Sequence, residues 1–187
     1  MEQAAGANRT NNPLHQDDFA LFHLECKFDL DTAALDERWK AMQRLSHPDK
    51  FATQSAAEQR VALQWSTRIN EAYRRLKNPL SRALYLSELL GLNVQLQTQT
   101  RMPEDFLLKQ MSWHESLDEA QELSQVEELS QQVLQAIEVE MSQCEKMLSP
   151  GSNLDSERLG ESLRAWVFMD RFLESVKSRA SLLQTRS

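Results

Sequence analysis

Apolar residues recur at helical spacing along most of the chain, and short polar segments separate the helices that they predict. Residues 29–46 form one such segment, which we expect Asp31 or Thr32 to cap. Its apolar positions are three or four residues apart: Leu35, Trp39, Met42 and Leu45. Residues 55–78 resume the period with the stripe Val61, Trp65, Ile69, Ala72, Tyr73 and Leu76. Because the connection between them is short, we expect these two helices to form an antiparallel hairpin.

Shorter helical segments flank this hairpin. Residues 17–28 predict a short first helix that offers three side chains for packing, Phe19, Phe22 and Leu24. After the hairpin, Pro79 interrupts the helical pattern because proline has no amide donor. Residues 80–91 then predict a further helix, with Gly91 as its C-cap. The first module therefore covers residues 17–92.

The second half of the chain predicts three long helices. Residues 93–102 lack a clear period, so we expect a linker there, followed by a second module at 103–187. The helices of this module are expected at residues 103–121, 124–148 and 154–183. The middle one has apolar residues at near-heptad spacing: Val126, Leu129, Val133, Ile137, Met141, Cys144 and Leu148. Short loops between long helices predict an antiparallel three-helix bundle.

Composition agrees with an all-α protein. Only four glycines and five prolines occur in 187 residues, and helix-forming residues dominate. The net charge of -7 argues against general binding to nucleic-acid phosphates. Residues 1–93 have 12 basic and 12 acidic side chains, whereas residues 94–187 have 9 basic and 16 acidic ones. Two modules of such different charge are expected to have different partners.

The two cysteines and the N-terminal segment bear on the cellular setting. Cys26 and Cys144 are far apart in the sequence, which favours a reduced cytoplasmic protein over a disulfide framework. We assign both to packing. Residues 1–16 are polar, and we interpret them as a disordered tail rather than a signal peptide. No run of 18 apolar residues predicts a membrane span.

The sequence motifs of common enzyme and metal sites are missing. No glycine-rich phosphate loop, GxSxG turn or HExxH motif occurs. The histidines are scattered, and the single spacing of His23 and Cys26 is weak support for a metal ligand pair. We therefore expect no catalytic residue, no cofactor and no metal.

The break between the hairpin helices, "QRLSHPDKFATQ" (43–54), contains unusual chemistry. Pro48 forces the helix to stop, and His47, Asp49 and Lys50 surround it with an imidazole, a carboxylate and an ammonium. An ordinary helix end would also explain them, with His47 near the negative end of the dipole and Asp49 in an Asx turn. However, the preceding helix has basic residues on its outer faces, so we favour a docking surface for a partner protein.

The first helix of the second module predicts apolar residues on two sides. At about 100° per residue, Phe106, Trp113 and Leu117 share the side that we assign to the core. A second cluster falls toward the opposite side, around Glu115: Leu107, Leu108 and Met111. In the last helix, Phe168 points away from the stripe formed by Leu159, Leu163, Trp166, Leu173 and Ala180. Geometry alone leaves two alternatives equally open, a second packed neighbour or an exposed binding patch.

The motif "HPDKF" and the order of helices around it resemble a J-domain over residues 17–90. J-domains stimulate the ATPase of seventy-kilodalton heat-shock chaperones of the DnaK/HscA kind. The resemblance implies that His47, Pro48 and Asp49 trigger hydrolysis. It also implies a basic docking face made of Arg38, Lys40, Arg44 and Lys50.

The text "INEAYRRLKNPLSRALYLSELLG" and the acidic module with "FLLKQMSWHESLDEA" are similar to the HscB-type co-chaperones. That family brings the iron–sulfur scaffold IscU to the chaperone HscA. The resemblance implies a scaffold-binding patch of Leu107, Leu108, Met111 and Phe168 with the acidic neighbours Glu115 and Glu119. Ser112 stands where some relatives carry a carboxylate, so we expect a weaker acidic rim here. The chain also lacks the Cys-rich N-terminal extension of some eukaryotic relatives, which favours a bacterial type.

Two other interpretations remain at this point. The chain is also compatible with a J-domain co-chaperone whose acidic bundle binds another client. A helical structural protein with an incidental His-Pro-Asp tripeptide is the third alternative. Binding of the scaffold distinguishes the first two, and a loss of function on His47→Gln excludes the third.

Overall fold

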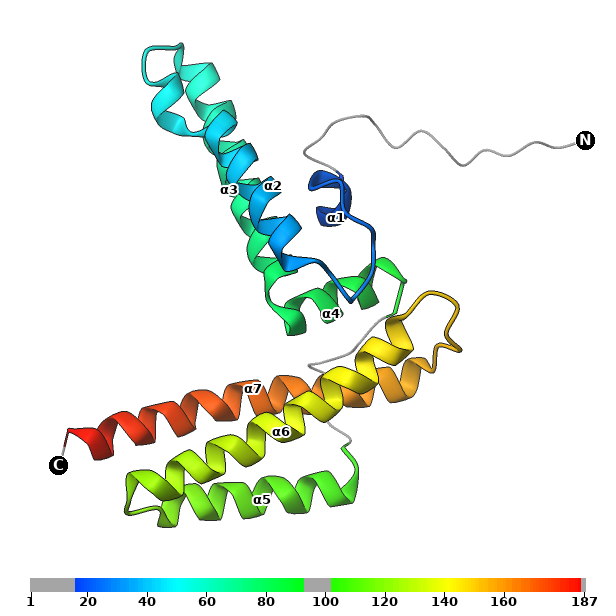
Figure 1. The fold of residues 1–187 in the computed structure, drawn as a ribbon, viewed down its shortest axis with the longest axis vertical. Coiled ribbons are helices and arrows are strands. Elements are labelled where there is room, and N and C mark those ends of the chain that lie inside the picture. Colours follow the sequence, from blue (N-terminus) through cyan, green and yellow to red (C-terminus); the bar gives the residue numbers. More distant parts are fainter. Residues whose placement is uncertain (1–15, 93–101, 186–187) are drawn as a thin grey trace, which may run out of the picture. The chain divides into compact units, whose positions relative to one another are not determined.

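In the computed structural model, which describes residues 16–92 and 102–185, all the regular structure is helical (Figure 1). The predicted all-α class is therefore confirmed. The elements are α1 (Asp18–Leu21), α2 (Thr32–Ser46), the 3₁₀ turn η2 (Pro48–Phe51), α3 (Ala56–Lys77), α4 (Pro79–Leu89), α5 (Glu104–Glu119), α6 (Leu123–Leu148) and α7 (Ser156–Gln184). Within the described part, no helix is both long and apolar enough to span a membrane.

Internal contacts divide the chain into two compact units between Arg82 and Ala83, inside α4. The predicted first module, 17–92, and second module, 103–187, stay predictions as to their boundaries. The predicted tail 1–16 lies outside the described residues except for Gln16, and the predicted linker 93–102 does so except for Met102.

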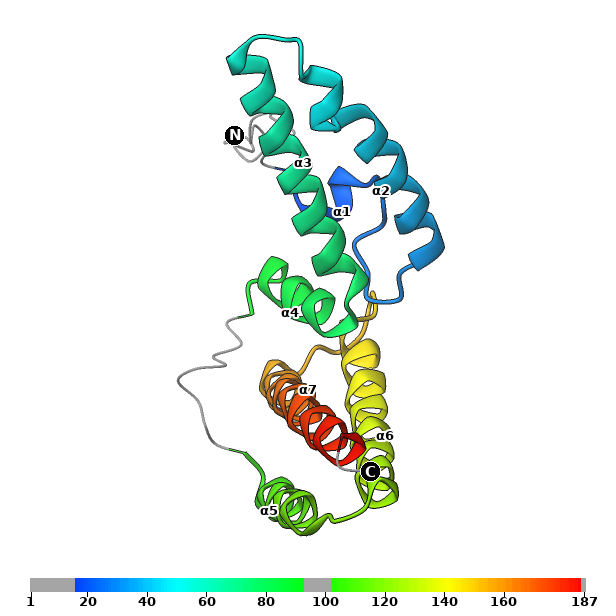
Figure 2. The same cartoon turned by 90° about the vertical axis from the view of Figure 1, so that its left-hand side faces the viewer.

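In the first unit, α2 and α3 run side by side in both views, as the sequence predicted (Figures 1 and 2). Asp31 caps α2 by accepting hydrogen bonds from the amides of Ala33 and Ala34, each 3.0 Å long. Ser55 and Glu58 cap α3 reciprocally in a capping box. These capping interactions fix the first residue of each helix.

The predicted first helix is shorter than expected. α1 is a single turn because His23 has a positive φ of 53°, a left-handed conformation that ends the helix. The Arg38 guanidinium from α2 donates to the carbonyl oxygens of Phe22 (2.7 Å) and His23, and so holds this turn. Asp18, which is fully buried, pairs with Arg68 (2.6 Å) and Arg75 (3.2 Å) of α3. Two ion pairs thus tie α1 to α3.

The hairpin core is well buried at one end only. Phe19, Leu35 and Ile69 are at most 2% exposed. Toward the η2 end the predicted stripe becomes accessible, with Leu45 73% and Val61 52% exposed. The predicted stripes are thus not buried along their whole length, because two helices alone bury only the side chains directly between them.

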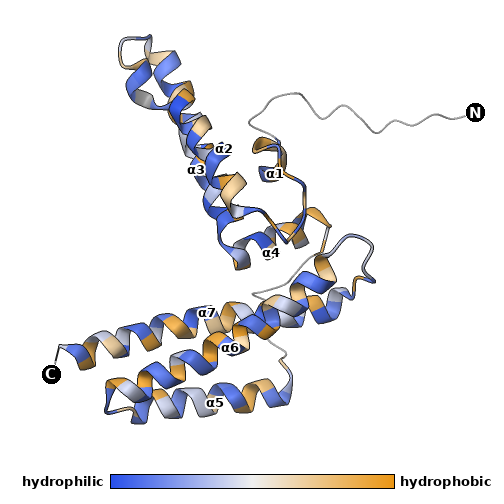
Figure 3. Cartoon of the chain, viewed as in Figure 1, coloured by the Kyte–Doolittle hydropathy of each residue, from blue (hydrophilic) through white to orange (hydrophobic). Residues whose placement is uncertain are grey.

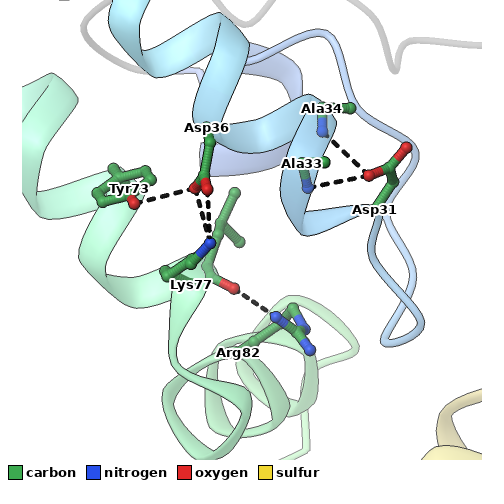
Figure 4. A network of polar contacts seen from close by, with 8 residues as sticks. Asp31, Ala33, Ala34, Asp36, Tyr73, Lys77 and Arg82 are labelled. Atoms are coloured by element: carbon green, nitrogen blue, oxygen red, sulfur yellow. Dashed lines mark hydrogen bonds and ion pairs between the residues drawn. The ribbon is translucent and has the colours of Figure 1, made fainter.

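A polar cluster joins α2 to α3 near the buried end (Figure 4). The Asp36 carboxylate accepts from both Lys77 Nζ (2.7 and 2.8 Å) and the Tyr73 hydroxyl (3.0 Å). Hydrogen bonds from Lys77 first, and from Tyr73 next, lower the pKa of Asp36. Trp39 stacks on Tyr73 with ring centroids 4.5 Å apart and donates from Nε1 to Asn70 (3.0 Å). The cluster fixes the register of the two helices.

The last helix of the first module also agrees with its local signals. Pro79 occupies the first position of α4, and Gly91 follows its end with φ 74°. The Gly91 amide donates to the Glu88 carbonyl (2.9 Å), and the Leu92 amide donates to the Ser87 carbonyl (2.9 Å). Gly91 is thus the predicted left-handed C-cap.

The second unit begins within α4, and α5, α6 and α7 form its three long helices, with α6 packed along α7. Hydrophobic and hydrophilic residues alternate along α6 and α7, as expected of amphipathic helices (Figure 3). The predicted core residues Phe106, Trp113 and Leu117 of α5 all belong to the buried cluster or pack against it. The predicted α6 stripe is buried or half-buried throughout. The three-helix module is therefore confirmed.

The two cysteines differ from each other. Cys144 is fully buried in α6, as expected, and burial raises its pKa to about 12. Cys26 is exposed, so its assignment to packing is wrong. It lies in the segment that follows α1, where partial desolvation, and then Asp17, raise its pKa.

We expect Asp36→Asn to lower the thermal unfolding midpoint at pH 7, because the amide loses the ion pair with Lys77. A carboxyl whose pKa is lowered by folding stabilises the fold above its unfolded pKa of about 3.9. That contribution disappears as the pH falls through the lower folded value. The midpoints of variant and unmodified protein should therefore converge in acid. Glu37→Gln, at an exposed neighbour, is the control; a difference that persists unchanged in acid would contradict the prediction.

We expect iodoacetamide to alkylate Cys26 in the folded protein and to leave Cys144 unmodified. The thiolate is the reactive form, and a pKa of about 12 makes it scarce at pH 8, so Cys144 should react at least about a hundredfold more slowly. Mass spectrometry of peptides measures both sites, and labelling in urea controls for intrinsic reactivity. Equal labelling in the folded protein would show that α6 opens readily.

Candidate functional surfaces

The turn between α2 and α3 is shaped by Pro48. α2 ends at Ser46, and His47 adopts extended backbone angles (φ -60°, ψ 126°), as expected of a residue before proline. Pro48 then begins η2, whose first hydrogen bond joins the Lys50 amide to the His47 carbonyl (3.0 Å). We call His47, Pro48 and Asp49 the HPD turn.

The HPD turn presents its polar groups outward. The side chains of His47 and Asp49 are 53% and 88% exposed. The Asp49 amide donates to His47 Nδ1 (3.3 Å), and Nδ1 lies 3.4 Å from the Asp49 carboxylate. With Nδ1 as acceptor, the neutral imidazole has its proton on Nε2, which remains as a donor. The turn therefore offers a donor and a carboxylate side by side.

The segment that follows the HPD turn is fixed to α3. Gln59 Nε2 donates to the carbonyl oxygens of Ala52 and Gln54, each at 3.1 Å. The Ser55 amide and hydroxyl both donate to the Glu58 carboxylate, at 2.9 and 2.6 Å. These contacts hold residues 52–55 against the first turn of α3 and so give the end of the connection a defined backbone.

Basic side chains lie beside the HPD turn. Lys40 and Arg44 are exposed one turn apart on α2, and Lys50 is exposed on η2. A shallow hollow is lined by Gln43, Arg44, His47, Asp49 and Lys50. The structure therefore brings together most of the predicted docking residues.

Arg38 does not fit the predicted docking face. It is half-buried, and its guanidinium is engaged by the backbone carbonyls that follow α1. This side chain fastens the turn after α1 to α2, so we leave it out of the docking surface proposed below. No spacing in the sequence shows which cations of an amphipathic helix reach back to a neighbouring turn.

The second predicted surface is on α5. Leu107, Leu108 and Met111 are 44%, 61% and 61% exposed, and we call these three side chains the α5 patch. The alternative in which a packed neighbour covers them is therefore wrong within the described part of the second unit. Glu115 and Glu119 are also exposed on this helix. The result is an accessible apolar patch with carboxylates alongside.

Phe168 of α7 behaves differently from the sequence expectation. It is half-buried and packs against the core rather than pointing away from it. Its ring meets Phe106 of α5 edge to face, with centroids 5.8 Å apart. The expectation that Phe168 points away from the core is thus wrong, because α5 lies close enough to α7 to contact its ring.

The sequence interpretation missed His114. Its ring centroid lies 6.0 Å from that of Phe168 and 4.8 Å from that of Phe172. Its spacing of seven residues from Leu107 and three from Met111 places it along the same side of α5. That spacing was visible in the sequence, but the aromatic partners on α7 were not.

No group of three or more His, Cys, Asp and Glu side chains in residues 16–92 and 102–185 is arranged to hold a metal ion.

A family model matches the second half of the chain, and individual relatives match most of its length. The family model described as the HSCB C-terminal oligomerisation domain matches residues 102–177. A Co-chaperone protein HscB homolog of Bordetella petrii is 39% identical over 166 residues, which cover 86% of this chain and 94% of that protein. A homolog of the same description from Burkholderia multivorans is 38% identical over 170 residues, covering 89% and 95%.

Solved structures agree with these relatives. The crystal structure of human co-chaperone protein HscB superposes with a TM-score of 0.82 at 30% identity, covering 88% of this chain and 82% of that one. Chaperone HscB from Vibrio cholerae gives a TM-score of 0.75 at 28% identity, covering 90% and 99%. With a J-domain architecture before a three-helix module, and relatives similar over nearly their whole length, this chain belongs to the HscB family of co-chaperones.

Proposed function

We propose that this protein stimulates the ATPase of an HscA/DnaK-type chaperone through His47, Pro48 and Asp49, and delivers an IscU-type iron–sulfur scaffold to it. The presentation of the HPD turn is the observation on which this proposal rests: an 88% exposed carboxylate beside a basic helix face. The delivered scaffold would then support maturation of iron–sulfur proteins. The predicted setting is the cytoplasm.

The protein would perform no chemistry of its own in this role. A partner changes the rate of a chaperone only if it binds the hydrolysing conformation more tightly than the resting one. This difference in affinity would come from polar and charged groups that pair with complementary groups on the chaperone: Asp49, His47 Nε2, Arg44, Lys50 and Lys40. Because the hairpin is rigidly paired at its other end, little ordering would be needed on binding.

The α5 patch would receive the scaffold. Three accessible apolar side chains within about one and a half helical turns suit a nonpolar partner surface, and Glu115 and Glu119 favour a basic rim around it. Phe168 contacts α5 through Phe106 and His114 and would add its ring to this surface. Separate surfaces on separate modules would allow both partners to bind at once.

A second copy of the chain is the competing occupant of the α5 patch, because the matching family model is described as an oligomerisation domain. Apolar patches of this kind also mediate symmetric dimers. Sedimentation of Leu107→Ser against the unmodified protein distinguishes the two. Loss of self-association in the variant would favour the second copy over the scaffold.

We expect His47→Gln to reduce stimulation of an HscA-type ATPase by about tenfold or more, because the imidazole and its orientation toward Asp49 are lost at a contact centre. Steady-state phosphate release measures the effect. Thr53→Ala, an exposed change in the same connection, should stimulate normally. Equal stimulation by His47→Gln and the unmodified protein would refute the trigger role.

We expect the double change Leu107→Ala with Met111→Ala to weaken scaffold binding by about tenfold or more, through loss of buried apolar contact. Isothermal titration with an IscU-type protein measures the affinity. Leu134→Ala removes a comparably exposed leucine (47%) from α6 and should bind normally. If both variants bind like the unmodified protein, the scaffold uses another surface or another client is bound.

A further inference from the structure

Phe168 is enclosed by two aromatic edges from α5. Phe106 meets it at an interplanar angle of 84°, and His114 meets it at 68°. Both geometries are the edge-to-face arrangement that the ring quadrupole favours. The orientation of the Phe168 ring is therefore set by two residues of α5, eight positions apart in the sequence.

His114 interacts with more than one ring of α7. It lies at 71° to Phe172, with centroids 4.8 Å apart. Phe168 and Phe172 are themselves stacked, with centroids 6.2 Å apart and planes 9° apart. The imidazole thus bridges two adjacent rings one helical turn apart.

His114 also adjoins the α5 patch. At about 100° per residue, His114 lies 20° from Leu107 and 60° from Met111 around the helix axis. His114 contacts the rings of α7, and Leu107 and Met111 follow it around the helix, farther from the core side, where both are exposed. His114 is exposed, whereas Phe106 packs against the bundle core. His114 is thus the more accessible of the two α5 residues that contact Phe168.

We propose that His114 is a positioning residue of the scaffold-docking surface: it holds the Phe168 ring in line with Leu107 and Met111, so that α5 and α7 present one continuous apolar face. This inference rests on the proposed scaffold-binding function. It assigns a role to a residue that the sequence motifs did not single out. His114 acts through Phe168, by constraining its ring rather than by direct recognition.

Replacement of the imidazole tests the ring contact. In titrations with an IscU-type scaffold, His114→Ala should bind about three- to tenfold more weakly, the range expected for an aromatic pair. His114→Phe retains an aromatic edge and should restore affinity. Ser116→Ala, an exposed change on another side of α5, should have no effect. The thermal unfolding midpoints of all three variants should match that of the unmodified protein.

A double-mutant cycle with Phe168→Leu tests whether His114 acts through Phe168. In the Phe168→Leu background, His114→Ala should cause little further loss, because the ring that it positions is gone. Independent, additive losses would overturn the proposal, as would unchanged affinity of His114→Ala or failure of His114→Phe to rescue. A drop in the unfolding midpoint that accounts for the loss of affinity would overturn it as well.

Scaffold binding by the unmodified protein distinguishes a failure of this inference from a failure of the proposed delivery function. If it does not bind the scaffold at all, the proposed delivery function fails, and the inference fails with it. If it binds and His114→Ala binds equally well, only the positioning role fails.

Discussion

The antiparallel pairing of α2 with α3 is the constraint on which the docking chemistry depends. Asp36, Tyr73 and Lys77 join the two helices near the buried end, and Asp18 fastens α1 beside them with two ion pairs. The opposite end has much less buried core. It is closed instead by local hydrogen bonds around η2 and by Gln59. The interactions that stabilise the hairpin are therefore concentrated at the end near Asp36, and the accessible polar groups are at the η2 end.

The second unit also separates its buried core from its accessible surface, here on two sides of α5. α5 is apolar on two sides, but only the side with Trp113 and Leu117 meets the bundle core. The other side keeps Leu107, Leu108 and Met111 accessible, which costs the free protein the hydrophobic stabilisation that their burial would provide. The aromatic cluster between α5 and α7 connects the two sides. Phe168 therefore belongs partly to the core and partly to the surface.

Local chemistry made most of the fold predictable from the sequence. The Asp31 cap, the Pro48 and Pro79 breaks and the Gly91 C-cap each depend on a few neighbouring residues, and all are found in the structure. Helical spacing placed Leu107, Leu108 and Met111 away from the core side of α5, but it left open whether a neighbour covers them, and only the family resemblance favoured an exposed patch.

The errors concern contacts between elements that are distant in sequence. Leu45 and Val61 have the spacing of core residues, yet the hairpin end that holds them is not covered by α1. Arg38 has the spacing of a surface cation, yet it reaches the turn after α1. The packing of Phe168 and His114 depends on how closely α5 approaches α7. Periodicity gives the direction of a side chain around its own helix but not the neighbour that it meets.

Cooperation between the two surfaces is most directly tested by ATP hydrolysis of an HscA-type chaperone, titrated with this protein at fixed concentrations of an IscU-type scaffold. If one molecule binds both partners, the scaffold should raise the rate well beyond the sum of the two separate stimulations. It should also lower the concentration of this protein needed for half-maximal effect. Strictly additive rates at every concentration would contradict delivery of the scaffold by this protein.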